Sequence, residues 1–120
     1  MKTIQLDREV LLSLYGDCKD SQIEVFSEFL SSYSEIKKNL YSAFESGNLF
    51  SLKRVLHFHG PSFMYLGIPA MAAKFKDLEQ KCSQADTHFS IAADFTELMQ
   101  AVEKSWVQAT IEMESFRKAV

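Results

Sequence analysis

Apolar side chains recur at intervals of three and four residues along most of the chain, which is the spacing of amphipathic helices. The pattern is clearest in four segments, the last of which covers about 30 residues. The positions that define them are Phe26, Phe29, Leu30, Tyr33, Leu40 and Phe44, then Leu52, Val55, Leu56, Phe63 and Leu66, then Met71, Phe75, Leu78 and Cys82, and finally Phe95, Leu98, Val102, Trp106, Ala109, Met113 and Phe116. This periodicity predicts an all-α protein, and the same spacing predicts that the ten Phe and Trp106 lie mostly in the core.

Capping and helix-breaking residues predict where these helices begin and end. A short N-terminal helix is expected to start at Asp7 and to end at Gly16-Asp17. The next helix should start at a capping box of Ser21 and Glu24 and end at Gly47, and the third should start at Asn48 and end at Gly67. Pro69 should start the fourth. Residues 83–88 are polar and are expected to form a loop before the last helix.

Four amphipathic helices with short connections predict an antiparallel up-and-down four-helix bundle, with the short extra N-terminal helix covering one end. Only four Gly and two Pro interrupt the chain, and hydrophobic residues make up 47% of it. These are ordinary globular values, and 120 residues suffice for one core. We therefore expect residues 1–120 to form a single helical domain, present as a monomer.

Charge and cysteine content narrow the range of functions. The net charge is −3 and the basic residues are scattered, which disfavours binding to nucleic acid. Cys18 and Cys82 belong to no recognisable motif and suit buried thiols of a reduced cytosolic protein. The chain has neither an apolar run of membrane-spanning length nor a signal-peptide core, so a cytoplasmic protein without a membrane partner is expected.

His57 is the most informative single residue, because helical spacing places it outside the apolar stripe. If Leu52 is set at zero on a helical wheel, His57 lies at about 140°, next to Lys53 at about 100° and Met64 at about 120°. The third helix should therefore present this imidazole to solvent beside a cation. A reactive or partner-facing histidine needs that setting.

The other two histidines have different expected roles. His59 falls within the apolar stripe, so we expect a buried or partly buried core histidine that is hydrogen-bonded to a neighbouring helix. It lies about 200° from His57 on the wheel, which prevents the two from sharing a metal. His88 lies in the expected loop and suggests no special role.

The chain resembles the histidine-containing phosphotransfer (HPt) domains of two-component phosphorelays from about Leu6 to Glu79. The residues that carry the resemblance are the turn Gly47-Asn48, the histidine His57, the small residue Ser62 five positions on, Gly67 ten positions on, and the later pair Leu78-Glu79. The resemblance implies a four-helix bundle in which His57 accepts a phosphoryl group. It also implies response-regulator receiver domains and a hybrid sensor kinase as partners. No cofactor of its own is implied, since the partner receiver supplies a divalent metal such as magnesium.

The family usually has Leu, Lys and Gly at the second, third and fourth positions after the histidine, where this chain has His59, Gly60 and Pro61. An exposed imidazole normally loses its proton near pH 6.5 and is then nucleophilic, so no extra base is required. The missing lysine would favour an anionic phosphoryl group. Lys53, one turn before His57, is a candidate replacement, and Arg54 is a weaker one.

Pro61 cannot donate an amide hydrogen to the carbonyl of His57, so the third helix should kink or open there. Gly60 could accommodate the backbone angles that a residue before proline prefers. Two interpretations are open: Gly60 and Pro61 keep the surface beside His57 low enough for a receiver to approach, or they form only a tolerated kink. Met64 is either part of an apolar docking patch or an isolated surface methionine.

Two functions fit these observations. The first is a phosphocarrier that relays a phosphoryl group between receiver aspartates through His57, without kinase activity of its own. The alternative is an HPt-like adaptor that docks receivers or kinases but is not phosphorylated. A haem or metal-binding bundle is disfavoured, since paired Glu-x-x-His elements are missing from the sequence.

Overall fold

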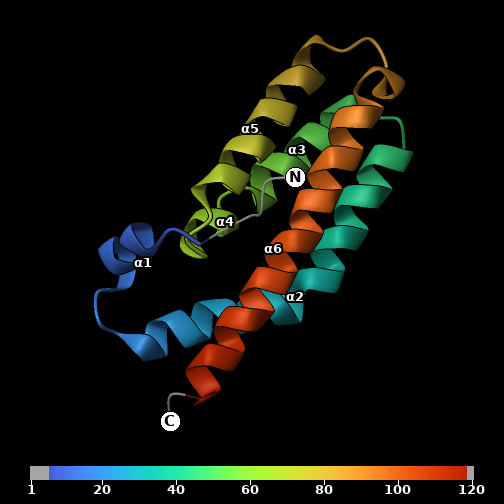
Figure 1. Ribbon diagram of the computed structural model, residues 1–120. Helices are drawn as coiled ribbons and strands as arrows, with labels where there is room; N and C mark the ends of the chain where they lie inside the picture. Colours follow the sequence, from blue (N-terminus) through green and yellow to red (C-terminus); the bar gives the residue numbers. More distant parts are fainter. Residues whose placement is uncertain (1–5, 119–120) are drawn as a thin grey trace.

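The computed structural model describes residues 6–118, and every regular element in that range is helical (Figure 1). The elements are α1 (Arg8–Tyr15), α2 (Lys19–Glu45), α3 (Leu49–His59), α4 (Ser62–Tyr65), α5 (Pro69–Gln84), the 3₁₀ turn η1 (His88–Ile91) and α6 (Ala92–Lys118). The expectation of an all-α protein is confirmed. None of the helices within residues 6–118 is both long and apolar enough to cross a membrane.

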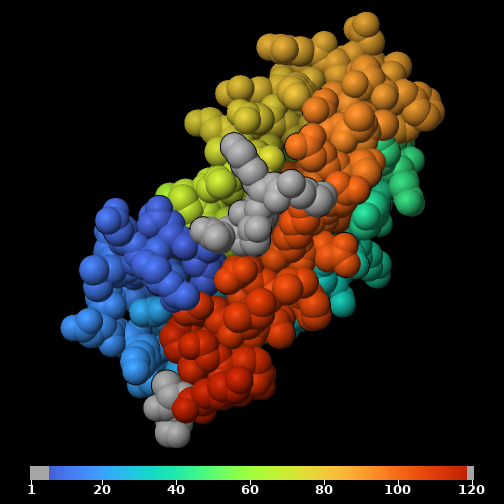
Figure 2. Space-filling model, in the orientation of Figure 1, coloured from blue at the N-terminus to red at the C-terminus, as the bar shows by residue number. Residues whose placement is uncertain are grey.

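The long helices alternate in direction along the chain, as the colour gradient in Figure 1 shows. α3 packs most extensively against α5, α2 packs against both α3 and α6, and α5 also contacts α6. α2 and α6 have 27 residues each, whereas α3 has only 11. The two long helices make the molecule elongated, and it extends 51 × 26 × 24 Å along its principal axes (Figure 2). α1 lies at one end of the molecule, against α2 and α4.

Most of the expected helix starts are confirmed. The side chain of Asp7 accepts hydrogen bonds from the amides of the first turn of α1, and Asn48 accepts one from the amide of Ser51. Pro69 occupies the first position of α5. The first turn of a helix leaves amide groups without a partner. Asp7 and Asn48 accept hydrogen bonds from such amides, and Pro69 has no amide hydrogen that would need a partner.

The expected capping box of α2 is wrong. The helix begins earlier, at Lys19, with Cys18 as its N-cap and no side-chain capping bond. Ser21 therefore lies inside the first turn, where its hydroxyl oxygen is 3.1 Å from the sulfur of Cys18. Cys18 is exposed, contrary to the expectation of two buried thiols, whereas Cys82 is buried.

One apolar cluster runs through the helices and contains most of the positions expected from the spacing. Trp106 is an exception, because it is exposed on α6, where it stacks on Tyr33 with the ring centroids 5.4 Å apart. Phe50, Phe58 and Phe89 are also exposed. The expectation that the aromatic residues are mostly core is right for the remaining seven Phe.

The third helix does not run unbroken to Gly67. α3 ends at His59, and α4 begins only at Ser62, with Phe63 and Met64 donating to carbonyls three residues back. The opening expected at Pro61 is confirmed. Gly60, however, keeps helical angles (φ −54°, ψ −48°) and does not take the extended angles expected before proline.

Packing explains the need for glycine at position 60. A Cβ at Gly60 would lie 3.0 Å from the Cβ of Phe75 on α5. The missing side chain therefore allows α3 and α5 to approach closely at the point where the chain turns into α4.

Gly67, which follows α4, contacts α1 through a backbone hydrogen bond and close packing. It has a left-handed backbone (φ +76°), and its carbonyl accepts a hydrogen bond from the amide of Asp7 at 2.6 Å. A Cβ on this residue would lie 2.6 Å from Cγ of Leu11. The placement of α1 therefore depends on glycine at this position.

Substituting Gly67 by Ala should lower the free energy of unfolding by about 2–5 kcal/mol, because a left-handed alanine costs about 1–2 kcal/mol and an overpacked contact about 1–3 kcal/mol. Gly16→Ala is the matched control, since Gly16 also has a positive φ (+57°) but has open space around it. It should lose only the backbone cost, about 1–2 kcal/mol. Urea unfolding of both variants measures the difference, and equal losses would contradict the tight contact with Leu11.

Candidate functional site

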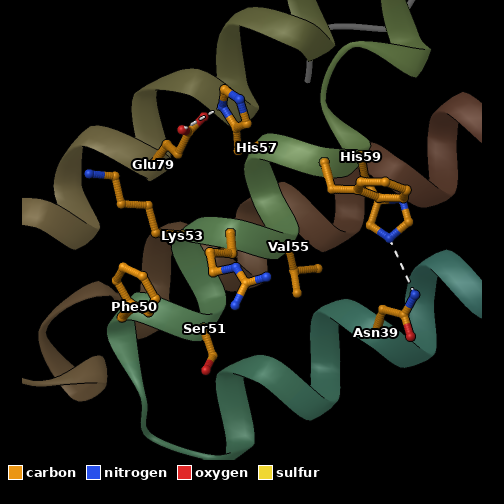
Figure 3. A pocket seen from close by; sticks show the side chains of 10 residues that line it. Asn39, Phe50, Ser51, Lys53, Val55, His57, His59 and Glu79 are labelled. Carbon is orange, nitrogen blue, oxygen red and sulfur yellow. Dashed lines mark hydrogen bonds and ion pairs between the residues drawn. The ribbon is translucent and has the colours of Figure 1, made fainter.

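His57 lies on the outer face of α3 with 79% of its side chain exposed. The exposure expected from the helical wheel is thus confirmed. Its Nδ1 is 3.0 Å from Oε1 of Glu79, which α5 supplies and which is only 19% exposed (Figure 3). The imidazole is therefore held at one nitrogen by a neighbouring helix while most of the ring remains in solvent.

This contact determines which ring nitrogen can react. An ionised carboxylate can only accept hydrogen bonds, so in a neutral imidazole the proton lies on Nδ1 and is donated to Glu79. Nε2 then carries the free lone pair. His57 is thus arranged as a nucleophile at Nε2, with a carboxylate that can stabilise positive charge developing on the ring.

A groove of about 530 Å³ beside His57 brings together most of the predicted site residues. Lys53, Gly60, Pro61 and Met64 line it with His57 on one side, and α5 supplies the other. Pro61 and Met64 are exposed, while Gly60 is buried against α5. Because the helix is interrupted between α3 and α4, the protein surface beside the imidazole is low.

The two predicted cations differ in their relation to the groove. Lys53 extends to the side of α3 that faces Glu79 (Figure 3). It is close enough to Cys82 to offset in part the burial that raises the pKa of that thiol. Arg54 does not line the groove, and its guanidinium lies over the ring of Phe50, 6.0 Å from the ring centroid.

His59 is buried on the opposite side of α3, as expected, with its Nε2 3.3 Å from Nδ2 of Asn39 on α2 (Figure 3). The amide of Asn39 can donate to an unprotonated Nε2, and burial lowers the pKa of His59. His59 is thus a neutral polar contact between α2 and α3. His88 starts η1 and packs against Phe44.

Few acidic residues surround His57. Residues 49–84 contain five Lys and Arg but only two acids, whereas the rest of the chain has eight bases and fourteen acids. One of the two acids is Glu79, which His57 contacts. The segment that carries the imidazole is therefore the least acidic part of an acidic protein, which favours approach of anionic groups.

Sequence reasoning missed the contact of Glu79 with His57, the place of Lys76 in the groove, and the exposure of Phe50 and Phe58. Glu79 appeared only as part of the Leu78-Glu79 pair, and a single sequence does not indicate which α5 residue faces His57. The two phenylalanines did leave a signal. On the wheel used for His57 they fall at about 160° and 240°, opposite the apolar stripe.

Comparison with known proteins yields no relative for this chain: no family model, no curated protein and no solved structure matches it. Within residues 6–118 there is also no group of three or more His, Cys, Asp or Glu side chains placed to hold a metal ion. The functional interpretation therefore depends on the chemistry of the site around His57.

His59 should make stability depend on pH. Its pKa is lowered in the folded state, so the unfolded chain binds a proton first as the pH falls below about 6.5. The contribution of His59 to stability should be constant above that pH and fall as the pH drops below it. His59→Leu should flatten this part of the curve. Chemical unfolding at several pH values tests it, and parallel curves for the two proteins would contradict the role of His59.

Proposed function

We propose that the chain is an HPt-like phosphocarrier, an antiparallel four-helix bundle with α1 across one end, in which His57 relays a phosphoryl group between receiver aspartates. The observation that carries this proposal is the geometry at His57: an exposed imidazole whose Nδ1 contacts Glu79 and whose Nε2 is free. The alternating directions of α2, α3, α5 and α6 support the bundle.

The proposed reaction needs only the imidazole from this chain. Nε2 attacks the phosphorus of an aspartyl phosphate, the phosphorus–oxygen bond to the carboxyl group breaks, and the aspartate leaves as a carboxylate. The ring becomes a phosphoimidazolium whose Nδ1 proton is hydrogen-bonded to Glu79. A second aspartate then takes the phosphoryl group by the reverse reaction, which restores the neutral ring.

The partners under this proposal are response-regulator receiver domains and a hybrid sensor kinase in the cytoplasm. Phosphoryl transfer depends mainly on positioning and on stabilising the charge of the transferring group. The receiver would bring the divalent metal, such as magnesium, and the groove beside His57 would provide access. The sparse acidic residues around His57 suit a partner whose reactive site is anionic.

Lys53 is the proposed source of positive charge on this chain. It lines the groove with His57, and Lys76 lines the same groove from α5. These lysines would favour an anionic phosphoryl group in place of the lysine that the family usually has three residues after the histidine.

The second candidate is an adaptor that docks receivers without accepting phosphate. One observation favours it: Gly60 and Pro61 stand where the family has Lys and Gly, so the cation on the same helix, one turn after the histidine, is missing. The docking face would be the same, so binding alone does not distinguish the two functions. Phosphorylation does.

The full chain should become labelled when mixed with receiver domains from the genome that encodes it, each phosphorylated by acetyl phosphate and Mg²⁺. The label should be acid-labile, and should vanish in His57→Gln but persist in His59→Gln. Label that survives His57→Gln would refute the site. A wild-type chain that binds these receivers but acquires no label would support the adaptor.

Glu79→Gln should slow labelling at saturating receiver by about tenfold, which corresponds to about 1.4 kcal/mol of activation free energy. The amide removes the negative charge and can donate to Nδ1, which would shift the proton to Nε2. Asp77→Asn is the matched control, because Asp77 is an exposed acid on α5 that does not line the groove. Equal rates for the two variants would show that the contact with Glu79 has no catalytic effect.

A further inference from the structure

Phe50, Arg54 and Phe58 form an exposed stripe on α3, one helical turn apart from each other. The two phenylalanines are 69% and 77% exposed, and Arg54 is exposed between them with its guanidinium over the ring of Phe50. Single exposed apolar residues are common, but residues at i, i+4 and i+8 share one face of a helix. We refer to these three residues as the aromatic stripe.

The aromatic stripe is continuous with the candidate site. Phe50, Arg54 and Phe58 line a shallow hollow of about 650 Å³ together with His57 and Lys53. This hollow is distinct from the groove on the α5 side, which contains Gly60, Pro61 and Met64. His57 and Lys53 line both. A molecule that covers the imidazole can therefore contact the stripe on one side and the groove on the other.

The composition of the stripe defines the surface that would fit it. Aromatic and arginine side chains dominate the binding energy of many protein interfaces, because they combine large apolar area with directed hydrogen bonds. Within residues 6–118, no carboxylate lies within 4.0 Å of Arg54, whereas Arg8 and Arg117 each pair with a glutamate. Arg54 can thus pair with a carboxylate supplied from outside.

We propose that the aromatic stripe selects the receiver partner: it binds an apolar surface of the receiver that carries a carboxylate opposite Arg54. The inference rests on the proposed function and adds a division of labour to it. The stripe contributes affinity and selectivity, while His57, Glu79 and the groove determine the rate of transfer once the partner is bound. Contacts made equally in the ground and transition states change KM and leave kcat unchanged.

The test measures the transfer kinetics of Phe58→Ala, Phe50→Ala and Arg54→Glu with receivers from the encoding genome. Each substitution should raise KM for the receiver that labels the wild type by about tenfold or more and change kcat less than twofold. Phe89→Ala is the matched control, since Phe89 is 76% exposed but lies on η1 and outside the hollow. It should leave both constants unchanged.

A small phosphodonor separates this inference from the proposed function. Phosphoramidate needs no docking surface, so Phe50→Ala and Phe58→Ala should be labelled by it as fast as the wild type, whereas His57→Gln should not be labelled. If the stripe variants keep the wild-type KM while His57 carries the label, the inference is overturned and the proposed function stands.

If no receiver transfers phosphate to the wild type, the phosphocarrier function fails, and titration with receivers activated by beryllium fluoride tests the stripe directly. Binding weakened tenfold by Phe58→Ala would then support the stripe as the docking contact of an adaptor. Receivers that bind the wild type and the stripe variants equally, or that bind neither, would overturn it.

Discussion

The close approach of α3 and α5 at Gly60 determines the geometry of the candidate site. With no side chain at this position, Phe75 packs against the backbone of α3, and α5 comes near enough for Glu79 to reach Nδ1 of His57. The same point is where Pro61 interrupts the helix, so the surface beyond the imidazole stays low. Gly60 and Pro61 thus have a structural consequence beyond a kink.

Local chemistry made much of the fold predictable. Helices start at Asp7, Asn48 and Pro69 because these residues leave fewer amide donors of the first turn without a partner. This capping effect depends on only a few neighbouring residues. Ser21 and Glu24 had the right spacing for a cap, but α2 already begins at Lys19, with Cys18 as its N-cap. A cap motif within a longer helical sequence fixes only one possible start.

The site was predictable where it depends on one helix and not where it depends on two. The helical wheel placed His57 in solvent and His59 in the core, because both lie on α3. The contact with Glu79 joins residues 22 positions apart, and its existence depends on how α5 rotates against α3. Phe50 and Phe58 were missed for a different reason: aromatic residues at helical spacing were expected in the core, although their wheel positions lay on the polar side.

Function here is inferred from one juxtaposition, an exposed imidazole and a carboxylate on the next helix, within the least acidic part of the chain. The position of the phosphoryl group on the protein tests the inference most directly. The measurement is phosphorus–proton correlation NMR of the full chain after treatment with phosphoramidate. If Glu79 holds the Nδ1 proton, phosphorus will couple to the ring protons of His57 in the pattern of an Nε2 adduct. Phosphorus on Nδ1, on His59 or His88, or no phosphohistidine at all, would contradict the proposed role of His57.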